Sequence, residues 1–437
     1  MQTSFSLSQL SDPDVAEAES ILRKCVHCGF CLATCPTYVT LGSELDSPRG
    51  RIYLIKDMLE NDRPAEPEVV THLDRCLTCL SCMTTCPSGV DYMHLVEHGR
   101  EHVEKTYRRP LADRAIRWLL ARTLPYPKRF RAALSMARLA RPIAGVFERV
   151  ASLKPLAAML RMAPARLPSS GDDRRSAVSA GPASGKRVAL LRGCAQSVLD
   201  PGINAATVRL LIRLGVRVVD VEGEGCCGAI VQHMGEQKQG VALAKANIDA
   251  WCRALDEGGL DAIVITASGC GTAIKDYGHL FRLDPAYAEK AARVSALAMD
   301  VTEFLAGLDL PLPSIEPGLV VAYHSACSMQ HGQRIVRQPK LLLANAGFVV
   351  RDVPEGHLCC GSAGTYNILQ PEIAAKLRTR KVGAIESVAP QVVATGNIGC
   401  ITQLAPSTDI PVLHTVELLD WALGGAKPDK LAARRTT

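Results

Sequence analysis

Residues 25–36 read Cys25-Val-His-Cys28-Gly-Phe-Cys31-Leu-Ala-Thr-Cys35-Pro36, and residues 76–87 read Cys76-Leu-Thr-Cys79-Leu-Ser-Cys82-Met-Thr-Thr-Cys86-Pro87. Both stretches have the spacing C-x2-C-x2-C-x3-C-P, which is typical of ferredoxin-type sites for 4Fe-4S clusters. Because the stretch occurs twice, the sequence predicts two 4Fe-4S clusters near the N-terminus.

The ligands of the two clusters are expected to cross over between the runs. In two-cluster proteins with this spacing, the fourth cysteine of each run binds the other cluster. The prediction for cluster 1 is Cys25, Cys28, Cys31 and Cys86, and the prediction for cluster 2 is Cys76, Cys79, Cys82 and Cys35. Such an exchange requires the two runs to fold against each other.

Two other interpretations of these cysteines are weaker. A pair of zinc knuckles would use C-x2-C pairs, but it leaves the additional cysteine and the proline of each run unexplained. A disulfide framework conflicts with the odd total of 17 cysteines, and the first residues do not resemble a secretion signal. We therefore expect a cytoplasmic chain in a reducing compartment, attached at most to the inner face of the cytoplasmic membrane.

The composition excludes several functional classes. A chain of 437 residues, 47% of them hydrophobic, is long enough for about two to four globular domains. Aromatic residues make up only 4% and the net charge is only +6, so we expect no nucleic-acid partner. No run of about 18 uncharged apolar residues occurs, so we also expect no transmembrane segment.

Positive charge is concentrated between Arg100 and Pro168, where 16 Lys or Arg residues stand against four acidic residues, a local balance of +12. The pattern predicts helices over 112–123, 132–139 and 143–159. Their apolar faces are expected to carry Trp118, Leu119, Leu120, Phe147 and Leu156. Two interpretations stay open: a helical collar that packs the cluster domain onto its neighbour, or an interfacial helix that docks on anionic lipid or an acidic partner.

The chain repeats itself beyond residue 187. Apolar runs predict three strands in each copy, at 187–194, 216–221 and 262–266, and at 319–327, 349–353 and 392–394. The separation between Cys194 and Cys327 equals that between Cys226 and Cys359. Because helical stretches separate the strands, each copy is expected to be an α/β unit with a parallel sheet.

Cysteines follow the predicted strands in both copies. Because the carboxyl ends of parallel strands meet at one edge of a sheet, we expect four thiols to gather in each copy. The two sets are Cys194, Cys226, Cys227 and Cys270, and Cys327, Cys359, Cys360 and Cys400. Cys252 lies outside both sets and is expected to be an ordinary buried or surface thiol.

The expected fold class is therefore α+β and multidomain. We expect five parts: a two-4Fe-4S ferredoxin domain at 1–100, a basic helical connector at 101–168, a linker at 169–186, and Cys-Cys-Gly repeats at 187–310 and 311–425. Within the first part, Ser47 should cap a helix that begins at Pro48. Arg49 and Arg51 either offset the charge of a cluster or lie on the surface.

Residues 223–228, Gly-Glu-Gly-Cys-Cys-Gly, match the dinucleotide-binding pattern G-x-G-x-x-G. The second copy tests this match, because its equivalent positions are Gly356, Leu358 and Gly361. The middle glycine, which lets the backbone approach a pyrophosphate, is missing there. We therefore reject a dinucleotide site, and the sequence contains no catalytic constellation that we would defend.

Together these features resemble the family of iron-sulfur subunits of bacterial glycolate oxidase (glycolate dehydrogenase), over residues 19–423. The resemblance is carried by the runs, the two Cys-Cys-Gly repeats and the stretches Ala267-Ser-Gly-Cys-Gly271, Lys275-Asp-Tyr-Gly-His279 and Cys359-Cys-Gly-Ser-Ala-Gly-Thr-Tyr366. It implies a flavin-containing partner subunit that oxidises glycolate to glyoxylate, with membrane quinone as the onward acceptor. The chain is then the non-flavin subunit of an oxidoreductase complex and does not act alone.

Related iron-sulfur subunits act in lactate utilisation and with anaerobic glycerol-3-phosphate dehydrogenase, and these remain alternatives. A cluster-based redox sensor or scaffold is the alternative of another class. The sequence shows no basic recognition helix that a DNA-binding sensor would need.

The resemblance also bears on the two cysteine sets. In the related heterodisulfide reductase, Cys-Cys-Gly domains hold noncubane iron-sulfur clusters with a pattern that ends in C-x2-C. Here Ala273 and Gln403 stand where that last cysteine is expected. Three interpretations stay open: a further iron-sulfur cluster assisted by His233 or His324, a zinc or quinone-adjacent site, or structural thiols.

Overall fold

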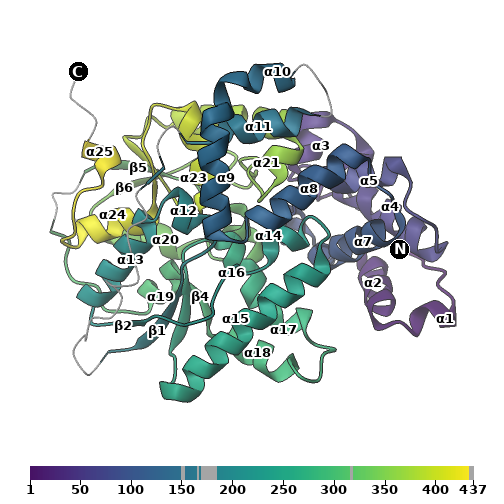
Figure 1. Cartoon of the computed structure of the whole chain (residues 1–437), viewed down its shortest axis with the longest axis horizontal. Coiled ribbons are helices and arrows are strands. Elements are labelled where there is room, and N and C mark those ends of the chain that lie inside the picture. Colours follow the sequence, from purple (N-terminus) through teal and green to yellow (C-terminus); the bar gives the residue numbers. More distant parts are fainter. Residues whose placement is uncertain (149–152, 165–166, 169–184, 315–317, 433–437) are drawn as a thin grey trace.

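The computed structural model describes residues 1–148, 153–164, 167–168, 185–314 and 318–432. A helical N-terminal part lies at one end of the molecule, and two α/β units form the rest (Figure 1). Basic helices run across the junction between them. The predicted α+β multidomain class is confirmed.

The N-terminal part consists of short helices around a small apolar core. Its elements are α1 (Leu7–Leu10), α2 (Pro13–Lys24), α3 (Pro36–Leu41), η1 (Glu44–Asp46), α4 (Pro48–Glu60), α5 (Pro67–Asp74), α6 (Ser81–Thr85) and α7 (Tyr92–Thr106). Ser47 caps α4 as expected, because its hydroxyl accepts a hydrogen bond from the backbone N–H of Gly50 at 3.0 Å. α7 continues through the predicted domain boundary at residue 100.

The basic segment forms a helical collar. Its helices are α8 (Leu111–Thr123), α9 (Pro127–Ala140), η2 (Arg141–Ile143), α10 (Ala144–Glu148) and α11 (Lys154–Met162). α8 is tied to the N-terminal part by Arg109 and Arg117, which both bind Asp74. α9 packs on α12 of the first repeat, and α11 packs on α21 and α22 of the second. The collar interpretation is therefore correct.

The first repeat contains a parallel sheet covered by helices. Its elements are β1 (Arg187–Leu191), α12 (Gln196–Leu199), α13 (Gly202–Arg213), β2 (Arg217–Val219), α14 (Ala229–Gln232), α15 (Gln237–Gly258), β3 (Ala262–Ile265), α16 (Ser268–Lys275), α17 (Tyr277–Leu280), α18 (Ala288–Leu297), β4 (Ala298–Asp300) and α19 (Val301–Ala306). The strand order is β2-β1-β3-β4, with all neighbours parallel.

The second repeat has the same topology. Its elements are β5 (Val320–Tyr323), the π-helix η4 (Ser328–Gly332), α20 (Gln338–Asn345), β6 (Val349–Asp352), α21 (Tyr366–Leu369), α22 (Pro371–Glu386), β7 (Val392–Thr395), α23 (Ile398–Leu404), η5 (Ala405–Ser407), β8 (Val412–His414), α24 (Thr415–Ala422) and α25 (Asp429–Ala432). The order β6-β5-β7-β8 repeats that of the first sheet.

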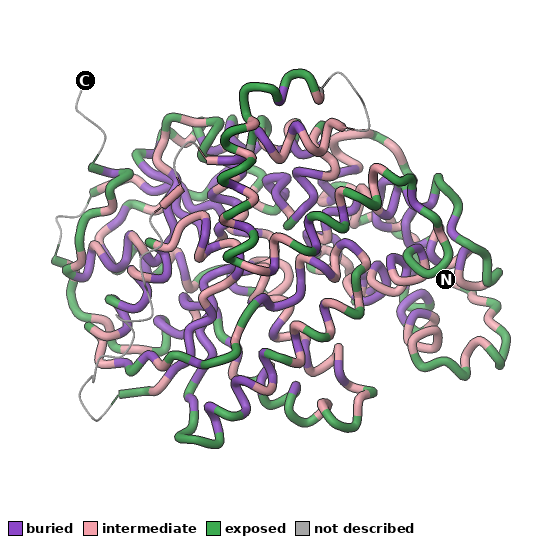
Figure 2. The backbone as a smooth tube through the Cα atoms, in the orientation of Figure 1, coloured by how far each residue is buried: buried purple, intermediate pink, exposed green. Residues whose placement is uncertain are grey.

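The repeats pack against each other through two equivalent pairs of helices. In each pair, the helix after the first strand of one repeat contacts the helix after the fourth strand of the other. α13, after the first strand of one repeat, packs on α24, after the fourth strand of the other. α20 packs on α19 in the same way, so the interface has approximate two-fold symmetry. Asp420 of α24 is 1% exposed and binds Arg209 and Arg213 of α13. Apolar side chains of both repeats form one continuous core, which Figure 2 shows as buried backbone.

Three expectations need correction. The fourth strand of each sheet, β4 and β8, was not predicted, because each runs directly into the helix that follows and no turn separates its apolar residues from those of the helix. The predicted helix over 143–159 is wrong as one element, since α11 begins at Lys154 after Leu153. Trp118 and Leu119 lie exposed, whereas Leu120 is buried. Most of the predicted linker, residues 169–184, lies outside the described residues.

A histidine pair joins the N-terminal part to the first repeat. The imidazole of His94 stacks on that of His279, with ring centroids 3.6 Å apart. His94 Nδ1 lies 2.8 Å from Asp91 and its Nε2 lies 3.0 Å from Asp276. Burial alone would lower the pKa of His94, but the hydrogen bonds to Asp276 and Asp91 raise it to about 10. His94 is therefore an imidazolium at neutral pH.

We expect His94→Gln to reduce the free energy of unfolding by about 1–3 kcal/mol at pH 7. Because the folded pKa is raised, the charged His94 contributes its full stability below the unfolded pKa of about 6.5 and loses it as the pH rises through about 10. The difference between wild type and variant, measured by thermal unfolding from pH 6 to 10.5, should therefore shrink with rising pH. His102→Gln on the same helix is the control, and a pH-independent difference would contradict the assignment.

Candidate iron-sulfur sites

The two cysteine runs have the same backbone conformation. His27 and Gly29 in the first run, and Thr78 and Leu80 in the second, occupy equivalent positions and all have positive φ, between 49° and 83°. Three of them are not glycine, so both loops hold a conformation that is unfavourable for ordinary side chains. Such turns direct backbone N–H groups towards a common centre, which suits an anionic cluster.

Each run lines its own cavity together with cysteine from the other run. Cys25, Cys28 and Cys31 share the first cavity with Cys82 and Cys86. The second cavity is lined by Cys35, Cys76, Cys79 and Cys82. The structure thus brings each predicted set of four together, with Cys82 at the wall between the two cavities.

Buried cations surround the second cavity. Arg51 is 1% exposed, and its Nη1 donates to Cys35 Sγ at 3.9 Å. Burial would raise the pKa of Cys76, but Arg51 and Arg100 hold it below its ordinary value. The Tyr92 hydroxyl also donates to Cys76 Sγ, at 3.7 Å. This donor set stabilises thiolates, which is what iron ligation requires.

The two arginines at the start of α4 therefore differ. Arg51 is buried beside the cysteines, where its charge faces Cys76 and Cys35, as expected of a residue that offsets negative charge. Arg49 forms an ion pair with Glu44 and its side chain is 32% exposed. An added Cβ at Gly29 would lie 2.8 Å from Arg49 Nη1, so this side chain covers the first loop.

Four thiols gather in the first repeat, as the strand ends predicted. Cys226 interacts with Cys194 and with Cys227, and Cys227 also interacts with Cys270. Hydrogen bonds from Cys194 and Cys227 lower the pKa of Cys226. Cys252 is buried elsewhere, on α15, as an ordinary thiol.

The second repeat gathers its four thiols in the same way. Cys327 Sγ lies 3.7 Å from Cys359 Sγ, and Cys360 Sγ lies 3.6 Å from Cys400 Sγ. His324 is 1% exposed, and one of its ring nitrogens lies within 4.8 Å of the sulfurs of Cys360 and Cys400.

The two repeats differ at this histidine. His324 lies three residues before Cys327, whereas Leu191 occupies that place before Cys194. Both ring nitrogens of His324 are buried, and hydrogen bonds from Cys360 and from His324 lower the pKa of Cys400 to about 5. A metal ion bound on this side of the site would give one of these buried nitrogens a partner.

The glycine of each Cys-Cys-Gly triplet is required sterically. Gly228 and Gly361 have φ values of 88° and 90°. An added Cβ would lie 2.8 Å from the carbonyl oxygen of Gly240 in the first repeat and 2.7 Å from that of Ala374 in the second. The helix that follows each triplet therefore packs directly on it and holds the two cysteines in place.

The second ferredoxin-type run lies against the second repeat. Cys79 packs in one apolar cluster with Cys359 and Tyr366. Burial and the neighbouring thiols Cys359 and Cys35 raise the pKa of Cys79, and Cys79 in turn raises that of Cys327. The predicted ligand set of cluster 2 is therefore a direct neighbour of the four thiols of the second repeat.

Sequence reasoning missed one buried cation. Lys381 is 2% exposed, and its Nζ donates to the carbonyl oxygen of Glu355 at 2.7 Å. Burial lowers the pKa of Lys381, while the thiols of Cys360 and Cys359 act in the opposite direction. Its position four residues after the buried Leu377 places it on the inner face of α22, a spacing that could have revealed it.

Among the described residues, no helix is both long and apolar enough to cross a membrane. The outer side of the collar nevertheless carries large apolar side chains. Those that are at least half exposed are Leu111, Trp118, Met136, Leu139, Ile143 and Val146.

Comparison with protein families agrees with this architecture. Residues 21–90 match the 4Fe-4S dicluster domain, and residues 188–275 and 321–405 match the cysteine-rich domain. The first match assigns iron-sulfur clusters to the N-terminal part. The second match covers the two α/β repeats and both four-thiol sets.

Relatives match over almost the whole chain. The glycolate oxidase iron-sulfur subunit of Escherichia coli is 44% identical, over 97% of this chain and 99% of its own length. A probable glycolate oxidase iron-sulfur subunit of Bacillus subtilis is 33% identical, over 93% and 95%. Lactate utilization protein A of Bacillus licheniformis is 28% identical but covers only 54% of this chain. The chain therefore belongs to the family of glycolate oxidase iron-sulfur subunits.

Proposed function

We propose that this chain relays single electrons within a glycolate-oxidising complex. A flavin-containing partner oxidises glycolate to glyoxylate, and the electrons pass through two 4Fe-4S clusters towards membrane quinone. Cluster 1 is held by Cys25, Cys28, Cys31 and Cys86, and cluster 2 by Cys76, Cys79, Cys82 and Cys35. Each bound cluster supplies a one-electron carrier, and the residues around it supply ligation, charge and exclusion of water.

The observation that carries this proposal is the order of the sites. The first cavity lies near the surface, where Cys28 is exposed. The second cavity shares Cys82 with it and is buried. Cys79 then contacts the thiols of the second repeat. The three sites thus form a series of neighbours that leads from the surface into the duplicated domain.

We further propose that the four thiols of each repeat hold an additional iron-sulfur centre. Four convergent thiols in each copy, three buried and one half-buried, exceed what packing requires, and no disulfide forms among the described cysteines. His324 and Lys381 add a nitrogen ligand and a positive charge to the second site. Zinc is the alternative occupant, since thiolate and imidazole also suit that ion.

The collar supports a peripheral position on the membrane. Its exposed apolar side chains, such as Trp118 and Leu139, stand among exposed arginines, including Arg114 and Arg138. Apolar side chains can enter the interface of a bilayer while the arginines bind anionic head groups. This arrangement supports a position at the membrane surface, where quinone is available.

Anaerobic purification of the chain with its natural partner tests the proposal. We expect a flavoprotein that oxidises glycolate to copurify, and iron and acid-labile sulfide at about twelve or more per chain, with paramagnetic resonance signals after reduction. About eight irons would restrict the clusters to the N-terminal part. A colourless, sulfide-free chain would refute the relay, and a lactate- or glycerol-phosphate-oxidising partner would refute glycolate as the substrate.

A further inference from the structure

An apolar cavity of about 240 Å³ lies between the two repeats, under the collar. Its apolar wall includes Leu120, Phe130, Leu134, Ile230 and Ile368. Cys194, Cys227 and Cys270, three of the four thiols of the first repeat, also line the cavity. The cavity thus adjoins a proposed iron-sulfur centre while it is lined mainly by hydrocarbon.

The cavity exists because the two-fold symmetry of the repeats is broken. On one side, α16 packs closely on η4: Ser268 Oγ lies 2.7 Å from Ser328 Oγ, and the side chain of Gln333 donates to the Ser268 carbonyl at 2.9 Å. The symmetry-equivalent pair on the other side is α23 and α12. There, residues of both helices, including Gln196 and Thr402, line the open cavity instead.

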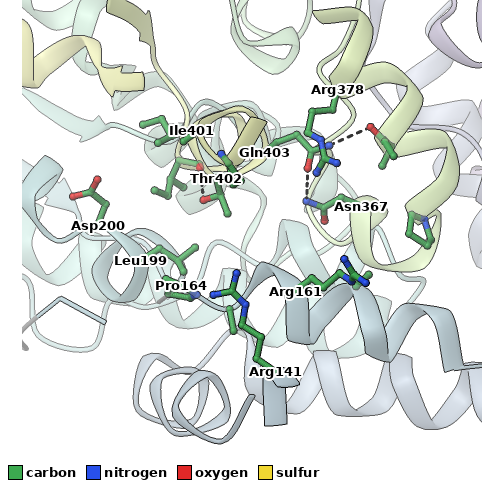
Figure 3. Close-up of a pocket in the computed structure, with 18 of the residues that line it drawn as sticks. Arg141, Arg161, Pro164, Leu199, Asp200, Asn367, Arg378, Ile401, Thr402 and Gln403 are labelled. Carbon is green, nitrogen blue, oxygen red and sulfur yellow. Dashed lines mark hydrogen bonds between the residues drawn. The ribbon is translucent and has the colours of Figure 1, made fainter. Parts of the chain in front are cut away.

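Two buried polar atoms in the cavity wall have no hydrogen-bond partner among the described residues. They are Nδ1 of His233 and Oδ1 of Asn367. The amide of Asn367 is held in orientation because its Nδ2 donates to Gln403 Oε1 at 3.0 Å (Figure 3). An unsatisfied buried donor or acceptor costs about 1–3 kcal/mol, so a rotation of either side chain that brings its atom to a polar ligand in the cavity would remove that cost.

A larger outer cavity adjoins the inner one. That outer cavity, of about 820 Å³, shares Leu199, Asn367, Ile398 and Thr402 with the inner one. Basic side chains, among them Arg141 and Arg378, stand in its wall (Figure 3). A molecule with a compact ring and an apolar tail could place the ring inside and the tail in the outer space.

The collar helix α9 separates the inner cavity from the exterior. Phe130, Leu134 and Ala137 face the cavity, whereas Met136 and Leu139 on the same helix are 71% and 79% exposed. One helix therefore presents apolar side chains both to the cavity and to the surface that we propose to contact lipid. A ligand that partitions into the bilayer has only this helix layer between it and the cavity.

We propose that the inner cavity binds the head group of a quinone, which makes the first repeat the exit point for electrons. An engineered cavity of about 150 Å³ accommodates benzene, so about 240 Å³ suits a substituted ring. His233 can donate to one carbonyl oxygen of the quinone. Asn367 Oδ1 can accept from a hydroxyl of the quinol that forms. This inference rests on the proposed function and adds the place where the acceptor binds.

The electrons and protons needed to reduce the quinone to a quinol are accounted for as follows. The quinone ring gains two electrons, delivered singly through the iron-sulfur centres from the two-electron oxidation of glycolate at the flavin partner. Each carbonyl oxygen gains one proton from water and becomes a hydroxyl. The thiols in the cavity wall set the direction from which the electrons arrive.

Ala137→Trp in the complete complex with the flavoprotein tests the site, because a bulky ring at this position fills the cavity. We expect kcat/KM for decylubiquinone to fall at least tenfold, while the glycolate-dependent reduction of a soluble dye and the paramagnetic resonance signals stay unchanged. Ala132→Trp lies on the exposed side of the same helix and is the matched control. Wild-type quinone kinetics in Ala137→Trp would overturn the site and leave the relay intact.

A photoreactive azidoquinone provides a test that needs no variant. We expect label in peptides from 127–140 or 362–369, with protection by excess decylubiquinone. Label confined to other peptides would overturn the site. A wild-type complex that reduces dyes but no quinone would instead refute the acceptor of the proposed function, and the site with it.

Discussion

Cys79→Ser is expected to abolish glycolate-dependent quinone reduction, with a loss of at least a hundredfold. Serine is a poor ligand for iron, so cluster 2 should be lost and the iron content should fall by about four per chain. Cys79 also contacts the thiols of the second repeat, so its loss interrupts the series at its middle. Oxidation of glycolate by a dye that takes electrons from the flavin should persist.

Cys252→Ser is the matched control for that experiment. Cys252 is a buried cysteine outside every proposed ligand set, and it should tolerate the same change without loss of iron or turnover. Steady-state quinone reduction, iron analysis and paramagnetic resonance on both variants give the comparison. A Cys79→Ser complex with an undiminished quinone rate would refute the relay through cluster 2.

Asp74→Asn is expected to destabilise the attachment of the collar by about 3–5 kcal/mol. Asp74 Oδ2 lies 2.6 Å from Arg109 Nη1 and 3.0 Å from Arg117 Nη2. The side chains of Arg109 and Arg117 are only 6% and 9% exposed, and the change removes the carboxylate that joins them, leaving them to Glu104 and Asp113, which are 29% and 31% exposed. The first unfolding transition in urea should move to a clearly lower concentration.

The pH dependence of the stability difference between wild type and Asp74→Asn distinguishes the loss of an ion pair from a loss of packing. Burial raises the pKa of Asp74, but the charges of Arg117 and Arg109 lower it by more than burial raises it. The pKa of Asp74 is therefore below its ordinary value. Its contribution is present above the unfolded pKa of about 3.9 and is lost as the pH falls through the folded pKa. The difference between wild type and variant should be constant from pH 5 to 8 and shrink in acid.

Asp57→Asn is the control for the buried ion pairs. Asp57 pairs with Arg63, and the two side chains are 44% and 45% exposed. Surface pairs of this kind contribute about 0–1 kcal/mol, so this variant should unfold almost like the wild type. An Asp74→Asn chain as stable as Asp57→Asn would show that the collar does not depend on these ions.

The sequence alone determined those features that depend on residues close together in the chain. The spacing of the two cysteine runs predicts clusters because a ligand loop needs only a few consecutive residues. Cys194 and Cys226 recur as Cys327 and Cys359 with one constant separation, which predicts a duplicated domain. Strands that stand apart from helices, such as β1, were found at their places, but β4 and β8 run directly into α19 and α24 and leave no separate apolar pattern.

Only the tertiary structure decided which sites are neighbours. Cys79 lies beside Cys327 although the two belong to different domains, and His324, not His233, stands among thiols of its own repeat. The cavity beside Cys194 likewise depends on a broken symmetry between repeats that are topologically alike. Such relations follow from how domains pack, and the packing energy is spread over many apolar contacts that no short stretch of sequence encodes.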